Sequence, residues 1–304
     1  MTRIFLTGAT GYIGGDALQV VAEKHPEYRI TALVRSNEKG QLVKNRFPSI
    51  DLVYGDLDDF DLLADQASCE HEGAAHAIAE GLSRKPAEAL GFVIHLSGSD
   101  LVCASDISAG THGEERDEIF DDWDGLDKVL TPTENAPHQQ VELTIVEAGK
   151  KGAKTAIVCP TAIFGPGRGP GNTRSIQVPE LASHILQRGS AFSVGEGKNI
   201  WSTLHIHDVS NLFLLLVEAG AQGGGQAAWV ALEQALLKST ELEHVNPDEA
   251  DKIWPNATAY LGTNSRVRAL RARKLLGWNP VGGDILEDIP AVIASEAKAL
   301  NLTK

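Results

Sequence analysis

The stretch TGATGYIGG, residues 7–15, constrains the fold more than any other feature of the sequence. It follows an apolar run at residues 4–6 and carries glycines at positions 8, 11 and 14. Between a strand and a helix, this spacing is typical of a loop that binds the pyrophosphate of a dinucleotide. Gly8 permits the tight turn, Gly11 lets the backbone approach the phosphates, and Gly14 lets the helix pack close to the strand. A glycine-rich turn without a ligand would show the same spacing.

A second feature concerns the choice of dinucleotide. Arg35 lies 21 residues after Gly14, where an acidic residue would bind the ribose diol of NAD. An arginine there suits the 2′-phosphate, so we predict NADP(H) in preference to NAD(H), the alternative being a solvated loop arginine. Asp56 in the stretch GDLDD either contacts the adenine ring or caps a helix that begins near Asp59. The predicted cofactor-binding residues are Gly8, Thr10, Gly11, Tyr12, Ile13, Gly14, Arg35, Asp56 and Leu57.

Apolar runs alternate with helical patterns along the chain. They predict strands at residues 4–6, 30–34, 50–54, 92–96 and 156–159, and helices at residues 13–22, 74–82, 138–148, 179–187 and 209–219. This alternation is typical of an α/β fold with a Rossmann-type, doubly wound parallel sheet. The run GPGRGPGN at residues 165–172 breaks it. We expect an NAD(P)-binding Rossmann domain at residues 1–160 and a small, mixed C-terminal substrate lobe at 161–304, with residues 201–220 returning to the Rossmann domain.

The composition disfavours several other classes of protein. Acidic residues outnumber basic ones by 41 to 27, and the net charge of −14 argues against nucleic acid as a partner. The longest apolar runs are too short to span a bilayer, so we expect no membrane partner. The three cysteines, Cys69, Cys103 and Cys159, have an odd count and no metal-ligand spacing. This pattern suits a reducing, cytoplasmic compartment.

Several motifs occur in a fixed order: TGATGYIGG, GDLDD, IVCPTAIFGPG at 157–167, LHIHDVS at 204–210 and RKLLGWNP at 273–280. With these motifs the sequence resembles the extended and atypical short-chain dehydrogenase/reductases, the NAD(P)-binding epimerase/dehydratase and NmrA-like group, particularly its fungal members. The resemblance covers nearly the whole chain. The last motif also predicts a helix that ends at Leu276, with Gly277 as a left-handed cap and Pro280 blocking continuation.

The resemblance implies a catalytic tyrosine, a lysine four residues later on the same helix, and a serine or threonine at a nearby strand end. The tyrosine would donate a proton to the substrate oxygen. In this chain the stretch NAPHQQVE places His138 at the tyrosine position and Glu142 at the lysine position. His138 then acts as a neutral or protonated donor, or is an ordinary histidine at a helix start. Ser97 or Ser99 fills the serine position, or merely starts a turn.

Two further groups of polar residues admit two interpretations each. Arg168 and Arg174 lie in the loop where relatives contact substrate, and either bind an anionic or carbonyl substrate or belong to a plain surface loop. His205, His207 and Asp208 have a spacing that a metal could use. In the family, however, this stretch is a strand leading to a helix that Asp208 would cap, so we predict no metal.

Two segments typical of the relatives are missing. Between helices that end near Ala67 and start near Ala74, relatives have a short apolar strand, whereas this chain has the polar SCEHEG. We therefore expect a sheet one strand short, with the strand at 92–96 pairing beside the strand at 4–6 to close the gap. The second deficit follows Trp229, where relatives continue an aromatic strand. Either the protein is a natural shortened variant or the sequence omits segments that its relatives have.

The sequence thus predicts an NAD(P)-dependent reductase, or a related enzyme, that acts on a small carbonyl compound. The main alternative is a dinucleotide-binding sensor or regulator of the NmrA type, which keeps the fold without turnover. A sugar-nucleotide epimerase or dehydratase ranks third, because that chemistry depends on the absent tyrosine. We expect a small-molecule substrate as the partner, and the sequence allows a homodimer.

Overall fold

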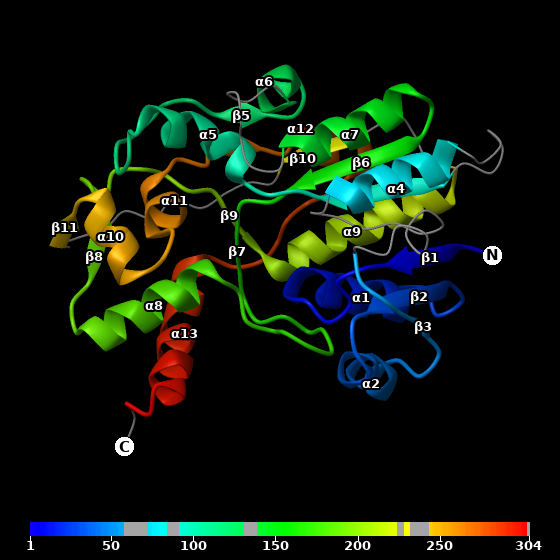
Figure 1. Ribbon diagram of the computed structural model, residues 1–304, viewed down its shortest axis with the longest axis horizontal. Helices are drawn as coiled ribbons and strands as arrows, with labels where there is room; N and C mark the ends of the chain where they lie inside the picture. Colours follow the sequence, from blue (N-terminus) through cyan, green and yellow to red (C-terminus); the bar gives the residue numbers. More distant parts are fainter. Residues whose placement is uncertain (58–71, 84–90, 131–138, 224–227, 232–242, 303–304) are drawn as a thin grey trace.

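The protein is built around two parallel half-sheets with helices packed against them (Figure 1). The computed structural model describes residues 1–57, 72–83, 91–130, 139–223, 228–231 and 243–302. Parallel strands that alternate with helices confirm the predicted Rossmann-type α/β class. Within the described segments, no helix is both long and apolar enough to cross a bilayer.

The N-terminal half-sheet has the order β1 (Arg3–Leu6), β2 (Arg29–Val34) and β3 (Asp51–Tyr54). All of its strand pairs are parallel. α1 (Tyr12–Lys24) connects β1 to β2, and α2 (Asn37–Arg46) connects β2 to β3. The apolar side chains of α1, α2 and β2 form a common core, so this half of the molecule has its own packed interior.

The second half-sheet has the order β10 (Ala228–Ala231), β6 (Lys154–Cys159) and β4 (Phe92–Leu96), again all parallel. α4 (Glu72–Ser83) and α7 (Gln139–Lys150) pack against each other on one face of β4 and β6. β10 therefore brings residues beyond 220 back to the sheet as well.

α9 (Ile206–Ala221) bridges the two half-sheets. Its Leu212 and Leu216 lie in the core of the second half-sheet, while its Val217 packs against the core of the N-terminal one. α9 also packs along α1, and Figure 1 shows it between the two groups of strands. In the described part of the chain, helices and not a strand pair therefore set the spacing of the two half-sheets.

β4 does not pair with β1, so the expectation that the strand at 92–96 closes the gap was wrong. Among the described residues β1 pairs only with β2, and β4 only with β6. The space between them is a cavity of about 960 Å³ lined by both strands. β4 keeps its place because Val93 packs into the core with α7 and Ile94 into the core with α9. Moving β4 toward β1 would remove both side chains from these cores.

The position of the missing strand is described only in part. Residues 58–71 lie outside the described residues, and Glu72 already belongs to α4. The prediction of a chain shortened before α4 thus stays a prediction. The described part of the sheet has the gap that such a shortening would leave.

The other elements form the C-terminal lobe and its connections. In chain order they are α5 (Asp100–Ala109), β5 (Phe120–Asp121), α6 (Leu126–Leu130), β7 (Ala162–Phe164), α8 (Gln177–Arg188), β8 (Phe192–Val194), β9 (Thr203–His205), β11 (Glu243–Val245), α10 (Pro247–Ile253), α11 (Ala257–Gly262), β12 (Val267–Arg268), α12 (Leu270–Leu276) and α13 (Ile285–Ala299). β8 and β11 pair in parallel and share an apolar core with α10 and α11. The lobe therefore has a core of its own, and the domain bounds predicted above stay predictions.

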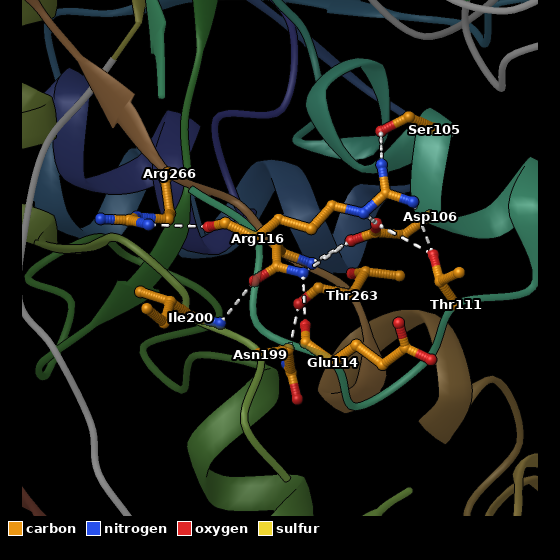
Figure 2. Close-up of polar contacts among 10 residues, drawn as sticks. Ser105, Asp106, Thr111, Glu114, Arg116, Asn199, Ile200, Thr263 and Arg266 are labelled. Carbon is orange, nitrogen blue, oxygen red and sulfur yellow. Dashed lines mark hydrogen bonds and ion pairs between the residues drawn. The ribbon is translucent and has the colours of Figure 1, made fainter. Parts of the chain in front are cut away.

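A buried carboxylate fixes this lobe to α5 (Figure 2). Asp106, 1% exposed, pairs with Arg116 at 2.6 Å and accepts hydrogen bonds from the backbone and side-chain nitrogens of Asn264 at 2.6 and 3.0 Å. The Arg116 guanidinium also donates to Thr111 Oγ1 at 2.7 Å. Both carboxylate oxygens of Asp106 are thus engaged, and a buried charge with its partners in place is expected to stabilise a single arrangement of the lobe.

All elements predicted from the apolar periodicity are present among the described residues, with ends shifted by up to three residues. The start of the helix predicted at 138–148 lies outside them, and α7 is described from Gln139. α12 ends at Leu276 with Gly277 at a φ of 65°, which confirms the predicted left-handed cap. The periodicity did not predict the helices α2, α5, α6, α10, α11 and α13.

Candidate functional site

The glycine loop between β1 and α1 has the geometry that an anion site needs. Gly8 has a φ of 71°, which favours glycine, and its carbonyl accepts a hydrogen bond from Gly11 N at 2.8 Å. A Cβ on Gly14 would lie 2.5 Å from the carbonyl oxygen of Gly8, so only glycine lets α1 start this close to β1. Gly11 is the N-cap of α1, and no side chain caps this helix in the described structure. The first N–H groups of α1 therefore remain for an anionic ligand.

Arg35 lies at the same edge of the half-sheet as this loop. It directly follows Val34, the last residue of β2, and β2 runs parallel to β1. The side chain is exposed and has no hydrogen bond or ion pair with any described residue. Asp56 follows β3 and is also exposed, while Leu57 packs beside Leu33. The alternative role of Asp56 as a cap of a helix near Asp59 lies outside the described residues.

Two residues of the glycine loop, Thr10 and Tyr12, connect it to the loop at residues 165–174. Asn172 N donates to Thr10 O at 2.9 Å, and the Tyr12 hydroxyl donates to Gly165 O at 2.6 Å. Burial raises the pKa of this hydroxyl above its ordinary value, so Tyr12 acts as a fixed neutral donor. Ile13 packs into the core around α9. The 165–174 loop is thus attached to the glycine loop at two points.

Asp16 in α1 makes a third attachment to this loop. Its carboxylate is fully buried and accepts hydrogen bonds from the backbone N and the guanidinium of Arg168, both at 2.6 Å. Ser210 of α9 donates to the same carboxylate at 2.6 Å. Burial alone would raise the pKa of Asp16, but these hydrogen bonds hold it below its ordinary value. The charged form of Asp16 therefore ties α1, α9 and the 165–174 loop together.

The guanidinium groups of Arg168 and Arg174 are both engaged within the protein. Arg168 pairs with Asp16 as described, and Arg174 binds Glu296 of α13 at 2.8 Å and Glu180 of α8 at 2.6 Å. Their partners hold each arginine against a helix. Substrate contact by either residue stays a prediction, and it would require these groups to share their present hydrogen bonds.

At the C-terminal end of β4 the structure places a serine, a glutamate and a histidine together. Ser97 is 3% exposed, and its hydroxyl donates to Glu142 Oε1 of α7 at 2.6 Å. His95 is 2% exposed, and its Nε2 lies 3.5 Å from the same oxygen. Glu142 Oε2 and both ring nitrogens of His95 have no hydrogen-bond partner among the described residues. Unlike Asp106, this buried cluster is only partly satisfied by hydrogen bonds among the described residues.

Ser99 and His138 are the other predicted catalytic residues. Ser99 is the N-cap of α5 and is half-buried, and its side chain makes no capping hydrogen bond. Its hydroxyl can therefore donate to a substrate oxygen, whereas the proton of Ser97 is directed at Glu142. His138 lies outside the described residues, one position before α7.

The histidines near β9 have a structural arrangement. His205 is the N-cap of α9, and its Nδ1 accepts from the backbone N of His207 at 3.2 Å. The expectation that Asp208 caps this helix was wrong, because its carboxylate accepts instead from the backbone N atoms of Val281 and Gly282, at 2.9 and 2.7 Å. Burial lowers the pKa of both histidines, which favours neutral rings. Within the described residues no group of His, Cys, Asp or Glu could hold a metal.

Two residues of these clusters were not predicted from the sequence. His95 is a polar residue within the apolar strand FVIHL, and Asp16 is an acidic residue among small and apolar ones in α1. A polar residue at an inward position of a buried element needs a partner, which is the signal that could have found both. Glu142 was considered only as a replacement for lysine, and its contact with Ser97 depends on the tertiary fold.

Comparisons with known proteins agree with this geometry. The profile of the NAD dependent epimerase/dehydratase family matches residues 137–231. An oxidase from Acremonium sp., ucsJ, is 32% identical, and the match covers 99% of each chain. By this relationship the chain belongs to the NAD dependent epimerase/dehydratase family, which binds nicotinamide dinucleotides.

Solved structures show the same fold at low sequence identity. UDP-glucose 4-epimerase from Thermotoga maritima superimposes with a TM-score of 0.64 at 14% identity, covering 98% of this chain and 100% of that one. The dTDP-glucose 4,6-dehydratase from Bacillus anthracis, solved with NAD, gives 0.65 at 11% identity, covering 98% and 97%. The alignment with the Acremonium oxidase spans 345 positions against 304 residues here, so this chain has no residue at 41 or more of them.

Proposed function

We propose that this protein is an NADP(H)-dependent reductase that acts on a small carbonyl compound. The observation that carries this proposal is the arrangement at one edge of the N-terminal half-sheet. The glycine loop, the uncapped start of α1 and Arg35, whose side chain has no partner among the described residues, lie at this edge. The similarity to an oxidase over the whole chain supports oxidoreduction as the type of reaction.

The residues of this edge fit the parts of the dinucleotide. The pyrophosphate would bind the backbone between Gly8 and Gly14, including Thr10, Tyr12 and Ile13, where close approach and the helix dipole favour an anion. Arg35 would bind the 2′-phosphate, and Asp56 with Leu57 would border the adenine ring. When bound, NADPH supplies a hydride to the carbonyl carbon.

The chain must then deliver a proton to the carbonyl oxygen. Ser99 has a hydroxyl free to donate, and His138 would stand close to the start of α7. Ser97 could donate only by turning away from Glu142. Because no tyrosine and lysine pair stands on α7, we expect slow turnover, since general acid help is worth about 10²- to 10⁴-fold. The substrate would be small. Arg168 and Arg174 lie in the loop that would contact it.

The engaged proton of Ser97 favours a second function, a dinucleotide sensor without turnover. Such a protein needs only different affinities for the oxidised and reduced dinucleotide. A sugar-nucleotide epimerase or dehydratase ranks third, because it lacks the tyrosine in the helix that carries this chemistry. A cytoplasmic location and a homodimer remain further predictions of the sequence.

The test measures NADPH oxidation with a panel of aldehydes, ketones and quinones, using wild type, Ser99→Ala and His138→Ala. Ser183→Ala on α8 is the matched control, because the hydroxyl of this serine hydrogen-bonds, among the described residues, only with Gln187 of the same helix. We expect slow, substrate-dependent oxidation that falls about 10²-fold or more in the variant that removes the proton donor.

The outcomes separate the candidate functions. Oxidation that is unchanged in both variants keeps the reductase and rejects both donors. If no compound is reduced, while NADPH and NADP⁺ differ at least tenfold in affinity, the sensor replaces the reductase. Interconversion of sugar nucleotides without net oxidation of NADPH would favour the epimerase.

A further inference from the structure

The loop at residues 165–174, between β7 and α8, lies directly against the glycine loop that would bind the dinucleotide. In Figure 1 it runs as a green segment beside α1. Glycines on both sides allow this contact. A Cβ on Gly171 would lie 2.2 Å from the carbonyl oxygen of Thr10. A Cβ on Gly169 would lie 2.6 Å from the carbonyl carbon of Gly15, so the two backbones touch at both points.

One peptide group of the glycine loop is held at both of its polar ends. Its N–H, that of Gly11, donates to Gly8 O at 2.8 Å. Its carbonyl, that of Thr10, accepts from Asn172 N at 2.9 Å. Because a peptide group is planar, these two hydrogen bonds fix the orientation of the whole unit. The N–H groups that follow at the start of α1, and that would bind the pyrophosphate, therefore depend on a residue of the 165–174 loop for their direction.

Asp16 places a negative charge close to the site of an anionic ligand. It lies four residues after Tyr12, the first residue of α1, which is about 6 Å along the helix axis. Burial alone would raise the pKa of Asp16, but its hydrogen bonds hold the pKa below the ordinary value, so the carboxylate is charged. An unpaired charge about 10 Å from a pyrophosphate, at an effective dielectric constant of about 20, would weaken binding about tenfold.

Arg168 of the 165–174 loop neutralises this charge. Its guanidinium pairs with one carboxylate oxygen of Asp16 at 2.6 Å, and its backbone N donates to the other oxygen, also at 2.6 Å. Ser210 of α9 adds a hydrogen bond at 2.6 Å. Of these two partners only Arg168 carries a positive charge. The ion pair as a whole therefore presents no net charge to the start of α1.

We propose that the 165–174 loop is a part of the dinucleotide site, in which Asn172 fixes the Thr10 peptide and Arg168 cancels the charge of Asp16. Asn172 and Arg168 are positioning residues, because they act through the glycine loop and through Asp16 and not by touching the ligand. This role does not require Arg168 to leave Asp16. The inference rests on the dinucleotide-binding part of the proposed function and does not depend on turnover.

The test of the charge measures the affinities for NADPH and NADH by isothermal titration calorimetry, since both ligands contain the pyrophosphate. Arg168→Gln leaves Asp16 buried without its cation, so we expect both dinucleotides to bind about tenfold more weakly. The double variant Asp16→Asn/Arg168→Gln removes both charges and should return to within about threefold of wild type. A role of the ion pair in the fold alone would not be restored in this way. The matched control is Arg188→Gln, because Arg188 pairs with Glu243 at 2.8 Å in the C-terminal lobe, and its affinity should equal that of wild type.

Gly171→Ala tests the contact with Thr10 independently. Because the added Cβ meets backbone, the two loops must separate, and we expect both dinucleotides to bind at least about tenfold more weakly. The matched control is Gly283→Ala, where the added Cβ meets only the end of the Glu287 side chain, which can move. Urea titrations of all variants separate a loss of affinity from a loss of stability.

Two results would overturn the role of Arg168: wild-type affinity in Arg168→Gln, or a double variant that binds as weakly as Arg168→Gln. Wild-type affinity in Gly171→Ala would overturn the role of the contact with the glycine loop. If Arg168→Gln fails to fold, the comparisons of the double variant and of Gly171→Ala with wild type still decide. Wild type that binds neither dinucleotide would overturn this inference together with the dinucleotide site. Binding without turnover would reject the reductase alone.

Discussion

At its C-terminal edge the N-terminal half-sheet has a glycine loop and the exposed Arg35, whereas the second half-sheet has a buried serine and histidine beside a glutamate of α7. In the first, each glycine of the loop has a backbone role that can be read directly, such as the close approach of Gly14 to Gly8. In the second, Ser97 and Glu142 bind each other, while Glu142 Oε2 and both ring nitrogens of His95 have no hydrogen-bond partner among the described residues. Among the described residues, the parts expected of a dinucleotide site are in place, whereas the candidate catalytic cluster has polar atoms without hydrogen-bond partners.

This difference follows from how anion binding and proton transfer are each built from the chain. An anion site is made by the backbone of one short segment, so it survives changes elsewhere in the fold. A proton-transfer site needs side chains from several elements, here β4, α5 and α7, at fixed distances. Loss of one pair of residues, or of one strand, affects the second task more than the first.

The largest expected effect is on the affinity for NADPH at the glycine loop of the N-terminal half-sheet. Gly14→Val places a side chain where even a Cβ would lie 2.5 Å from the carbonyl oxygen of Gly8. Because the contact is with backbone, α1 must move, and we expect NADPH to bind about 100-fold more weakly or not at all. Isothermal titration calorimetry measures this. Gly277→Ala, which strains a distant left-handed cap, should lower stability and leave the affinity unchanged. Equal losses in both variants would contradict the assignment of the loop.

The second effect is on the free energy of unfolding, through the contacts of Asp16 that join α1, α9 and the 165–174 loop. Asp16→Asn removes the charge that binds Arg168 and Ser210, and we expect unfolding to become easier by about 1–2 kcal/mol in urea titrations. The matched control is Asp51→Asn, whose partner Arg29 is exposed. Its cost should stay below about 0.5 kcal/mol. A similar cost for the two variants would show that the buried contact does not hold the halves together.

The smallest effect depends on pH. His25 after α1 binds Glu218 of α9 at 2.8 Å, and the hydrogen bonds with Glu218 and Glu27 raise the pKa of His25. Because the folded pKa is the higher one, this stabilisation is full below the ordinary value of about 6.5 and is lost as pH rises through the raised pKa. We expect wild type to exceed His25→Gln in free energy of unfolding by less than about 1 kcal/mol at pH 6, and not at pH 9. An advantage that persists at pH 9 would refute a charged His25.

The sequence predicted local backbone features better than contacts between distant segments. The glycine loop, β2 and the Gly277 cap depend on local backbone chemistry, and all three are present where expected. The closing of the gap by β4 was predicted wrongly, because the packing of Val93 and Ile94 outweighs the cost of an open strand edge. The ties of Asp16 to Arg168 and of Ser97 to Glu142 join residues 152 and 45 positions apart. No local pattern specifies such pairs.

The dinucleotide preference tests the central claim most directly. Calorimetric titrations of NADPH and NADH would use wild type, Arg35→Ala and Arg29→Ala, the last being an exposed arginine at the opposite end of β2. A charge-assisted pair with the 2′-phosphate is worth about 1.5–3 kcal/mol, so wild type should bind NADPH at least about tenfold more tightly than NADH. Arg35→Ala should abolish this preference, and Arg29→Ala should retain it. Equal affinities in wild type, or a preference that survives Arg35→Ala, would contradict the account.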